Sequence, residues 1–320
     1  MFRKIPLLVL LLILLLVPLS LMTAQDGDDG TLIGILIPTT DNDFAAGVSE
    51  GALAAAEALG INVVVLASEG DVAVEAENLA TLIEQGIDAL LITPTDAVES
   101  LATIAAANEA GIPVFILGDT FSVAEAEIDV VSTIGFDNSD AGETAAEILC
   151  TNLENTGSVI EVVNLADVNA ELRSAGFNAY MAESCSDVTL ISVDVTDLEA
   201  RAVVGALRDA FSENDINGIF ANNDMDALLA MQATIRARLV GVTLIGFNAT
   251  TDTLGAVQLG RITGIMSPAG SELGSTGVET ANAYLTGEEI ESNVFTDIFF
   301  INADEMVAVR GRCTSDCGDD

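Results

Sequence analysis

Short apolar runs alternate with segments of helical spacing along most of this chain. Residues 32–37 (LIGILI) predict a buried strand, and apolar residues then recur at helical spacing from Phe44 to Leu59, just before Gly60. The same alternation predicts further strands at 62–67, 88–93, 112–117, 158–163, 188–194, 217–221 and 242–247. Helical segments separate these strands at 72–83, 98–109, 140–153, 171–184, 198–212 and 225–237. Regular alternation of strand and helix is typical of an α/β fold with parallel sheets and right-handed crossovers.

The length of the chain favours two lobes. It has 320 residues, of which 50% are hydrophobic and only 4% aromatic. This exceeds the usual size of one domain, and the strand–helix alternation starts again at residue 140. A core of Ala, Val, Leu and Ile suits parallel strands that are covered by helices.

The charge balance excludes some partners. Fifty Asp and Glu residues stand against ten Lys and Arg residues, so the formal net charge is −40. Such a charge repels polyanions and disfavours nucleic acids and anionic membrane surfaces as partners.

The N-terminus has the layout of a secretory signal. Arg3 and Lys4 precede an apolar run from Ile5 to Leu21, and small and polar residues follow, with Ala24 at the expected cleavage position. An uncleaved anchor is the alternative, because a run of about 17 residues is near the lower limit for a membrane-spanning helix. We expect residues 1–24 to be a signal peptide and the protein to be periplasmic or extracellular.

Residue types that many enzymes require are missing. Beyond residue 24 the chain has no Lys, and it has no His anywhere. Ser-His and Cys-His pairs, imidazole metal sites, Schiff-base lysines and the lysine of a phosphate loop are therefore excluded. No motif places two carboxylates across a bond, as a glycosidase requires. The sequence indicates no catalytic activity, no cofactor and no metal site.

Four cysteines follow the predicted signal: Cys150, Cys185, Cys313 and Cys317. In an exported protein an even number favours disulfides, and four cysteines allow three pairings. We favour a bond between Cys150 and Cys185, near the ends of two predicted helices, and one between Cys313 and Cys317 in a short C-terminal loop. A metal pair is the less favoured alternative, since there is neither a His nor a second CxxC motif.

Polar turns follow the predicted strands. These turns are rich in Asp, Asn and Thr, which hydrogen-bond hydroxyl groups, and we expect them to lack the cations that a phosphate needs. In open α/β folds ligands bind beyond the carboxyl ends of the strands. For a single turn, capping of the next helix is the simpler interpretation, but seven turns converging on one cleft favour a polar ligand. The turns lie at 38–44, 93–96, 118–121, 135–140, 164–173, 221–224 and 246–252.

Six segments carry a resemblance to a known family: GILIPTTDNDFAAGVSEGALAAAEALG, NLATLIEQGIDALLITPTDA, ANEAGIPVFIL, IGFDNSDAGETAAEIL, GIFANNDMDALLAM and LIGFNATTD. In their order and spacing the chain resembles the ribose-binding type of periplasmic sugar-binding proteins of ATP-driven importers, over roughly residues 31–305. The resemblance implies two Rossmann-like lobes and a hinge of three crossovers, near 135–138, 266–269 and 294–297. It assigns 31–136 and 268–295 to an N-terminal lobe, 137–267 and 296–312 to a C-terminal lobe, and 313–320 to a C-terminal tail.

The resemblance also implies ligand-binding positions. Asn42 and Phe44 match the pair in the first turn that hydrogen-bonds a sugar hydroxyl and stacks on the sugar ring. Asn223 matches an Asn that reaches the ligand, and Asp224 matches the Asp that follows it. Asp137 lies in a turn that borders the hinge.

Four positions depart from the ribose-binding pattern. Where the family has Arg residues for the ligand, this chain has Asp119 and Glu171; Asn248 stands where the family has an Asp, and Ser267 where it has a Gln. Loss of a bidentate Arg removes a strong contact to vicinal hydroxyls. Asp119 and Glu171 favour an amino-bearing or cationic ligand, but two desolvated acids are costly without a positive partner. A neutral sugar or polyol therefore remains the first choice.

Phenylalanines provide candidate apolar faces for a sugar ring. They are Phe44, Phe121 and Phe136, and the simpler interpretation is that phenylalanines beside strands fill the core.

The function implied by the resemblance is ligand capture by hinged closure. We expect a monomer whose lobes close on a small polar ligand, such as a sugar or polyol, and present it to the permease of an ABC importer. A sensory protein that reports ligand to a membrane receptor has the same sequence features and stays open as an alternative. A transcription regulator of the related core would need an N-terminal DNA-binding module, and catalysis is the least favoured function.

Overall fold

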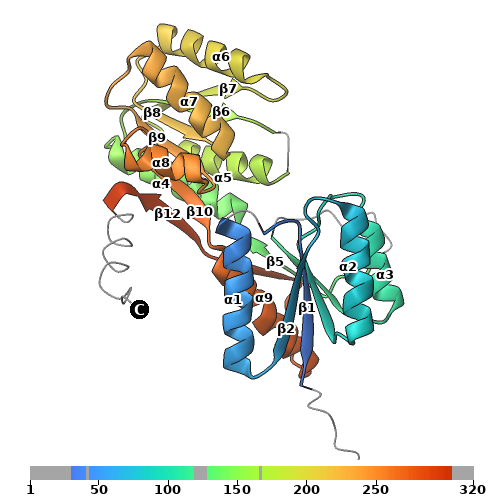
Figure 1. Ribbon diagram of the computed structural model, residues 1–320. Coiled ribbons are helices and arrows are strands. Elements are labelled where there is room, and N and C mark those ends of the chain that lie inside the picture. The colour runs from blue at the N-terminus through green and yellow to red at the C-terminus, as the bar shows by residue number, and fades with distance from the viewer. Residues whose placement is uncertain (1–29, 41–42, 119–127, 166–167, 305–320) are drawn as a thin grey trace, which may run out of the picture. The chain divides into compact units, whose positions relative to one another are not determined.

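The computed structural model describes residues 30–40, 43–118, 128–165 and 168–304, and these carry two six-stranded sheets (Figure 1). Sheet A contains, in order across the sheet, β11 (Asn293–Thr296), β5 (Ser132–Phe136), β4 (Val114–Leu117), β3 (Ala89–Ile92), β1 (Leu32–Ile37) and β2 (Asn62–Ala67). Sheet B contains β12 (Ile298–Asn302), β10 (Gly264–Pro268), β9 (Thr243–Phe247), β8 (Gly218–Ala221), β6 (Gly157–Val163) and β7 (Val188–Asp194). The paired strands run parallel, except that β12 is antiparallel to β10. The predicted α/β class is confirmed.

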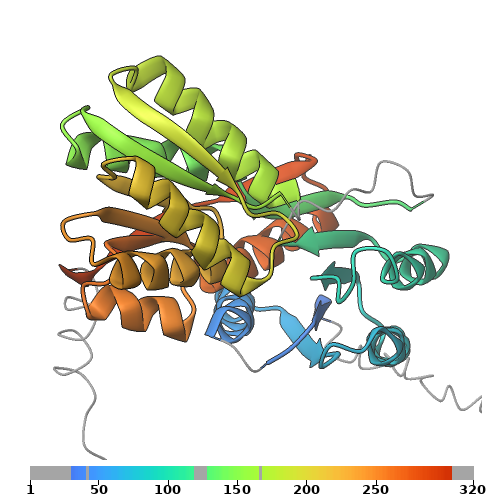
Figure 2. The ribbon, with the colours of Figure 1, turned by 90° about the horizontal axis from the view of Figure 1, so that it is seen from above.

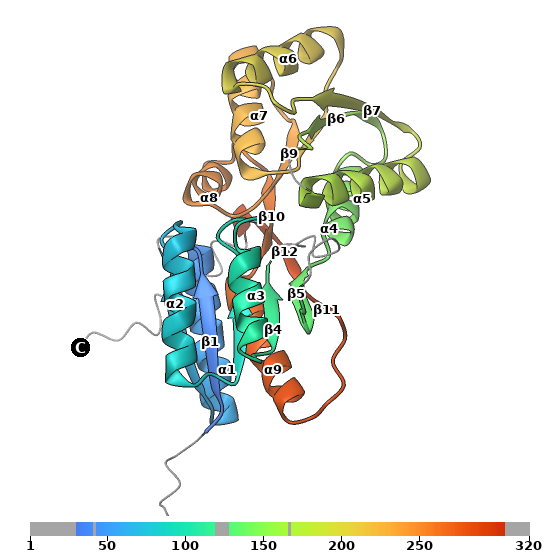
Figure 3. The ribbon, with the colours of Figure 1, turned by 90° about the vertical axis from the view of Figure 1, so that its right-hand side faces the viewer.

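Helices cover both faces of each sheet. On sheet A, α1 (Asp43–Leu59) and α9 (Gly270–Leu285) share one core with the strands, and α2 (Val72–Gln85) and α3 (Leu101–Glu109) share the other. Figure 2 looks along α1 and α2 and shows them on opposite sides of β1. On sheet B, α4 (Asn138–Asn152) and α5 (Val168–Ser184) cover one face. The other face carries α6 (Ala200–Glu213), α7 (Asp224–Ala237) and α8 (Thr251–Gln258) (Figure 3).

Strand β1 illustrates how the sequence builds these layers. Ile33 and Ile35 belong to the core beneath α1 and α9, whereas Leu36 belongs to the core beneath α2 and α3. Because successive side chains of a strand point to opposite faces, a strand covered on both faces is apolar along most of its length. Gly51 lets α1 pack closely against α9, since a Cβ atom at this position would collide with the backbone of Ser271.

The chain crosses between the two sheets three times. Asp137 connects β5 to α4, Ala269 connects β10 to α9, and Asp297 connects β11 to β12. These connections confirm the three predicted crossovers. We call residues 30–136 and 269–296 the sheet A half and residues 138–268 and 298–304 the sheet B half; the lobe boundaries given above stay a prediction.

Two predicted helix starts need correction. Helix α3 begins at Leu101 rather than residue 98, because Asp96 holds a turn by accepting hydrogen bonds from the backbone N–H groups of Val98 and Glu99 (both 2.8 Å). These same bonds lower the pKa of the Asp96 carboxyl. Helix α5 begins at Val168 rather than residue 171. Apolar and polar residues alternate in its first turn, Val168–Glu171, so the spacing typical of a helix appears only later.

Candidate ligand-binding site

A cavity of about 1220 Å³ lies at the carboxyl ends of the sheet B strands. Asn164 follows β6, Asn223 follows β8 and Asn248 follows β9, and all three line the cavity. Parallel strands bring residues that are far apart in sequence to one edge of the sheet, which is where α/β folds bind ligands. The sheet A half contributes Phe44, Thr93, Gly118, Phe136 and Gly270 to the lining.

Asn223 caps α7 and lines the cavity at the same time. Its Oδ1 accepts a hydrogen bond from the backbone N–H of Asp226 (2.8 Å). The carboxylate of Asp226 is buried and accepts hydrogen bonds from the side-chain amides of Asn223 (2.5 Å) and Asn164 (2.9 Å). The predicted residue Asp224 also lines the cavity. Local hydrogen bonds therefore hold this turn in place before any ligand arrives.

Asn248 and Ser267, both predicted, line the cavity as well. Asn248 has φ 65°, a left-handed conformation that Asn adopts more readily than most residues. Its backbone N–H donates to the carbonyl of Met266 (2.9 Å), and its own carbonyl accepts from Thr253 Oγ1 (3.0 Å). The hydroxyl of Ser267 donates to the carbonyl of Pro268 (3.1 Å).

Arg173 is the main correction to the predicted site. We expected these turns to lack cations, but the guanidinium of Arg173 lines the cavity and its side chain is only 5% exposed. Its Nε donates to the carbonyl of Asn222 (2.9 Å) and its Nη1 to Oδ1 of Asn138 (2.6 Å). The guanidinium carbon lies 4.2 Å from the centre of the Phe247 ring, within cation–π distance. The expectation of a cavity wall without cations is wrong.

Glu171, which the resemblance had placed against the ligand, has a different location. It is exposed and lines neither this cavity nor a smaller one of about 290 Å³. The next two residues of α5, Leu172 and Arg173, line the smaller and the larger cavity respectively. The structure thus brings a guanidinium, and not the carboxylate of Glu171, to the wall.

Asp137 lines the smaller cavity, next to the first crossover. Its carboxylate caps α4 by accepting from the backbone N–H of Asp140 (3.0 Å). Gly118 and Phe136 line both cavities, so the two adjoin. Two other predicted ligand residues, Asn42 and Asp119, lie outside the described residues.

Aromatic rings form part of the wall. Phe44 is 37% exposed and meets Phe136 edge to face, with ring centres 6.2 Å apart. Both were predicted, whereas Phe121 lies outside the described residues. Phe247 was missed, although it ends β9 and belongs to the predicted turn at 246–252. Such rings provide an apolar surface for the C–H face of a sugar.

The polar groups of the wall can both donate and accept. Carboxylates of Asp224, Asp226 and Asp252 accept hydrogen bonds, Arg173 donates, and the amides of Asn residues do both. A polyhydroxy molecule needs this mixture, because each hydroxyl group is both a donor and an acceptor.

A buried carboxylate supports α5 from below. Glu161, in the middle of β6, is fully buried. It accepts hydrogen bonds from the hydroxyl of Ser174 (2.5 Å), the amide of Asn178 (2.8 Å) and the hydroxyl of Ser192 (3.3 Å). Burial raises the pKa of Glu161, and the three hydrogen bonds oppose this shift. Two of the donors belong to α5, the helix that carries Arg173.

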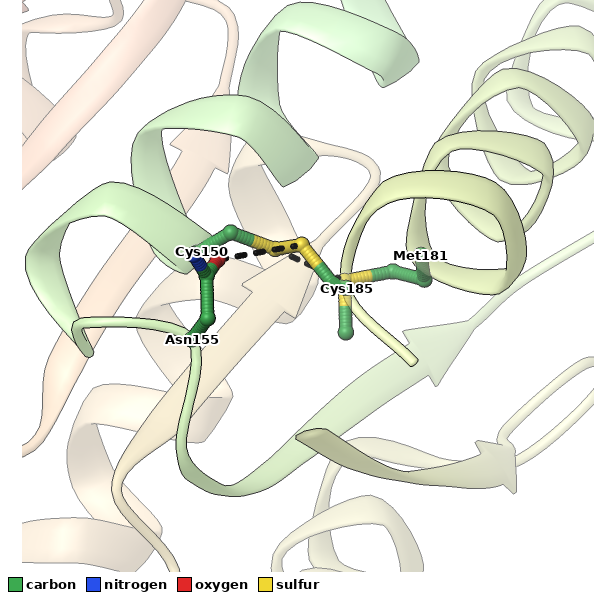
Figure 4. Close-up of a disulfide and its surroundings, with 4 residues drawn as sticks. All are labelled: Cys150, Asn155, Met181 and Cys185. Carbon is green, nitrogen blue, oxygen red and sulfur yellow. Dashed lines mark hydrogen bonds between the residues drawn. A yellow bond between two sulfur atoms is a disulfide. The ribbon is translucent and has the colours of Figure 1, made fainter. Parts of the chain in front are cut away.

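A disulfide joins the two helices on the same face. Cys150 in α4 is bonded to Cys185, which directly follows α5, and their Cα atoms are 6.2 Å apart (Figure 4). Both cysteines are buried, and the sulfur atoms of Cys150 and Met181 are 3.5 Å apart. The structure contains the pairing that we favoured; Cys313 and Cys317 lie outside the described residues.

Two features are absent from the described residues. They contain no cluster of three or more His, Cys, Asp or Glu side chains arranged to hold a metal ion. None of the helices in this part of the chain is both long and apolar enough to cross a membrane. The predicted signal at residues 1–24 lies outside it.

Comparisons with known proteins identify relatives. A family model described as "Periplasmic binding protein domain" matches residues 33–289. The ribose import binding protein RbsB of Haemophilus influenzae is 30% identical over 285 residues, which cover 89% of this chain and 96% of the relative. RbsB of Escherichia coli K12 is 29% identical over 267 residues, 83% of this chain and 88% of the relative.

Solved structures agree on the fold. AraP, an arabinose binding protein from Geobacillus stearothermophilus, superposes with a TM-score of 0.78 over 87% of this chain and 99% of its own. Its sequence is 22% identical, so this likeness concerns the fold alone.

Proposed function

This chain belongs to the periplasmic binding protein domain family, and from that premise we propose that it binds a sugar or a similar polar molecule for an ABC importer. It is a binding protein and not an enzyme, as the sequence indicated. The relatives named as ribose import binding proteins support a sugar as ligand. The observation that carries the proposal is the cavity at the strand ends, where Asn164, Asn223, Asn248 and Arg173 come together.

The proposed mechanism is closure of the two halves around the ligand. The three crossovers at Asp137, Ala269 and Asp297 are the connections about which the halves would turn. A ligand favours the closed state only if it binds that state more tightly. We propose that Phe44 and Asn42 contact it from the sheet A half, and Asn223 and Asn248 from the sheet B half.

We favour a neutral sugar or polyol over a cation, because the wall combines the carboxylates of Asp224, Asp226 and Asp252 with the guanidinium of Arg173. The argument for a cationic ligand depended on Asp119 and Glu171 in place of Arg residues. Arg173 now supplies a positive charge in the wall, and Glu171 lies away from it. A positive ligand would meet this guanidinium, whereas hydroxyl groups can use it as a donor.

We further propose export of the protein as a monomer that docks on a permease. A cleaved signal at residues 1–24 would place it in the periplasm or outside the cell. The Cys150–Cys185 disulfide suits such an oxidising compartment. The strongly acidic charge is compatible with a secreted, soluble binding protein.

The test is a ligand screen of residues 25–320. Thermal shift against neutral sugars, polyols, amino sugars and polyamines should find its largest increase in Tm with a neutral sugar or polyol, and calorimetry then gives the Kd. If no compound of the panel raises Tm, the proposed function fails. If polyamines or amino sugars give the largest increase, the neutral ligand class is wrong.

Asn223→Ala tests the site itself. This variant loses the ligand contact and also the α7 cap, which costs about 1 kcal/mol of stability. The matched control is Asp71→Ala, because Asp71 caps α2 through the N–H of Ala73 (2.8 Å) and does not line the cavity. We expect Asn223→Ala to weaken binding about tenfold or more, as loss of a buried hydrogen bond does, and Asp71→Ala to leave the Kd unchanged. Equal Kd values for the two variants would contradict the assignment.

A further inference from the structure

Part of the lining of the large cavity is apolar. This part of the lining comes from the start of α6 and the residues just before it, and from the N-terminal halves of α7 and α8. We call this region the apolar end: Leu198, Ala200, Val203, Met225, Leu229 and Leu254. All six belong to the sheet B half, which also supplies most of the polar lining. The apolar end is therefore part of the same cavity as the polar site.

The exposure of these side chains distinguishes the apolar end from ordinary surface. Val203 and Leu229 are buried and form its floor, at 2% and 6% exposure. Met225 and Leu198 are 59% and 43% exposed. Single exposed apolar residues are common on protein surfaces. Two of them beside a buried apolar floor, within one cavity, form a continuous apolar surface that a ligand can cover.

The volume of the cavity supports a ligand larger than one sugar ring. Pockets for drug-sized ligands usually enclose about 300–1,000 Å³, and this cavity has about 1220 Å³. A monosaccharide would fill only part of this volume, so that part of the apolar lining would stay in contact with water. Apolar atoms placed there would be removed from water, which favours binding.

We propose that the ligand is a sugar with an apolar substituent, a glycoside whose alkyl or aryl group occupies the apolar end. This inference rests on the proposed function, because it assumes that the sugar ring binds at the Asn cluster. Each methylene group that the apolar end buries should strengthen binding about fourfold. The substituent, rather than the ring alone, then determines which sugar derivative the protein prefers.

The experiment compares substituents on the same sugar. Calorimetry on residues 25–320 measures the Kd of D-ribose, L-arabinose and D-glucose, and of the methyl and n-butyl glycosides of each as both anomers. We expect at least one butyl glycoside to bind about tenfold or more tightly than its methyl counterpart. In the double variant Leu198→Ser/Met225→Ser this gain should fall below about twofold, while the Kd of the free sugar or methyl glycoside stays the same.

Leu259→Ser is the matched control, because Leu259 is 76% exposed and does not line the cavity. It should retain the full preference for the butyl group. The inference is overturned if butyl and methyl glycosides bind equally. Equal binding is expected if closure of the protein covers the apolar end with the sheet A half and leaves no room for a substituent. It is also overturned if the double variant keeps the gain. If free sugars bind but no glycoside does, this inference fails alone; if neither binds, the proposed function fails with it.

Discussion

The two halves of the molecule share a strand order but stabilise their helices differently. Each sheet has a closely packed helix pair on one face, α1 with α9 on sheet A and α4 with α5 on sheet B. Glycines permit the close approach in both pairs: Gly51 in α1 for the first pair, and Gly142 in α4 and Gly176 in α5 for the second. Only the second pair, among the described residues, also has a disulfide. The same topology thus supports two different ways to hold helices together.

The positively charged residues are also distributed unequally between the two halves. The sequence of the sheet A half, at residues 30–136 and 269–296, contains no Lys, Arg or His. The sheet B half contains six Arg residues, of which Arg173 is buried in the cavity wall. It also contains the buried carboxylate of Glu161 beneath α5. The sheet A half therefore offers aromatic and backbone surface to a ligand, and the sheet B half provides most of the directional polar contacts.

Among the predicted effects on stability, removal of the disulfide between α4 and α5 should be the largest. In Cys150→Ala/Cys185→Ala a cross-link over 35 residues is lost, and by chain entropy the free energy of unfolding should fall by about 3–4 kcal/mol. Urea unfolding of variant and parent measures the loss, and parent protein in reductant should show a similar one. A loss below about 1 kcal/mol would mean that packing alone holds α4 against α5, as it holds α1 against α9.

Arg173→Met should have the next largest effect. The substitution keeps most of the apolar volume but removes the donors to Asn138 Oδ1 and to the carbonyl of Asn222. Two buried hydrogen bonds from a charged group contribute about 3 kcal/mol together. The control is Arg208→Met on α6, where the side chain is exposed and the change should stay within about 0.5 kcal/mol. Equal unfolding free energies for both variants would show that the buried network does not stabilise the sheet B half.

Glu75→Ala examines the corresponding polar support in the sheet A half. Glu75 in α2 is 1% exposed and accepts from the backbone N–H of Thr95 (2.8 Å) and the hydroxyl of Ser100 (3.1 Å). Its removal leaves these donors without this acceptor, and we expect a loss of about 2 kcal/mol in urea unfolding. Glu77→Ala, an exposed site on the same helix, should change stability little. If Glu75→Ala lowers the unfolding free energy no more than Glu77→Ala does, the buried hydrogen bonds of Glu75 do not stabilise the sheet A half.

The fold was predictable to a large extent because most of its central strands are short and mainly apolar runs. The bounds of β1, β2 and β7 agree with the predicted 32–37, 62–67 and 188–194. Helix α5 begins three residues earlier than predicted, since its first turn carries the polar residues Asn169 and Glu171. Local pattern fails there because a side chain such as Asn169 is selected for the cavity rather than for the core.

The site was predictable only in part, for a physical reason. Asn223, Asn248 and Ser267 were placed through the resemblance, which aligns them with ligand positions of the family, and all three line the cavity. The role of Arg173 depends on Asn138, Asn222 and Phe247, which come from three distant segments. No local spacing predicts that these groups enclose one guanidinium, so only the three-dimensional arrangement reveals it.

The smallest and most specific effect is expected from Glu161→Gln. Because burial raises the pKa of Glu161, its contribution to stability is fully present below the ordinary value of 4.5 and is lost as pH rises through the raised pKa. Gln cannot ionise, so the unfolding free energy of the variant minus that of the parent should increase with pH over this window and then level off. Ser174→Ala should have the opposite effect, because Ser174 lowers the pKa of Glu161 and its loss would raise that pKa further. A difference that does not change with pH would mean that Glu161 titrates as an ordinary carboxyl, and the buried support beneath α5 would then be no more than packing.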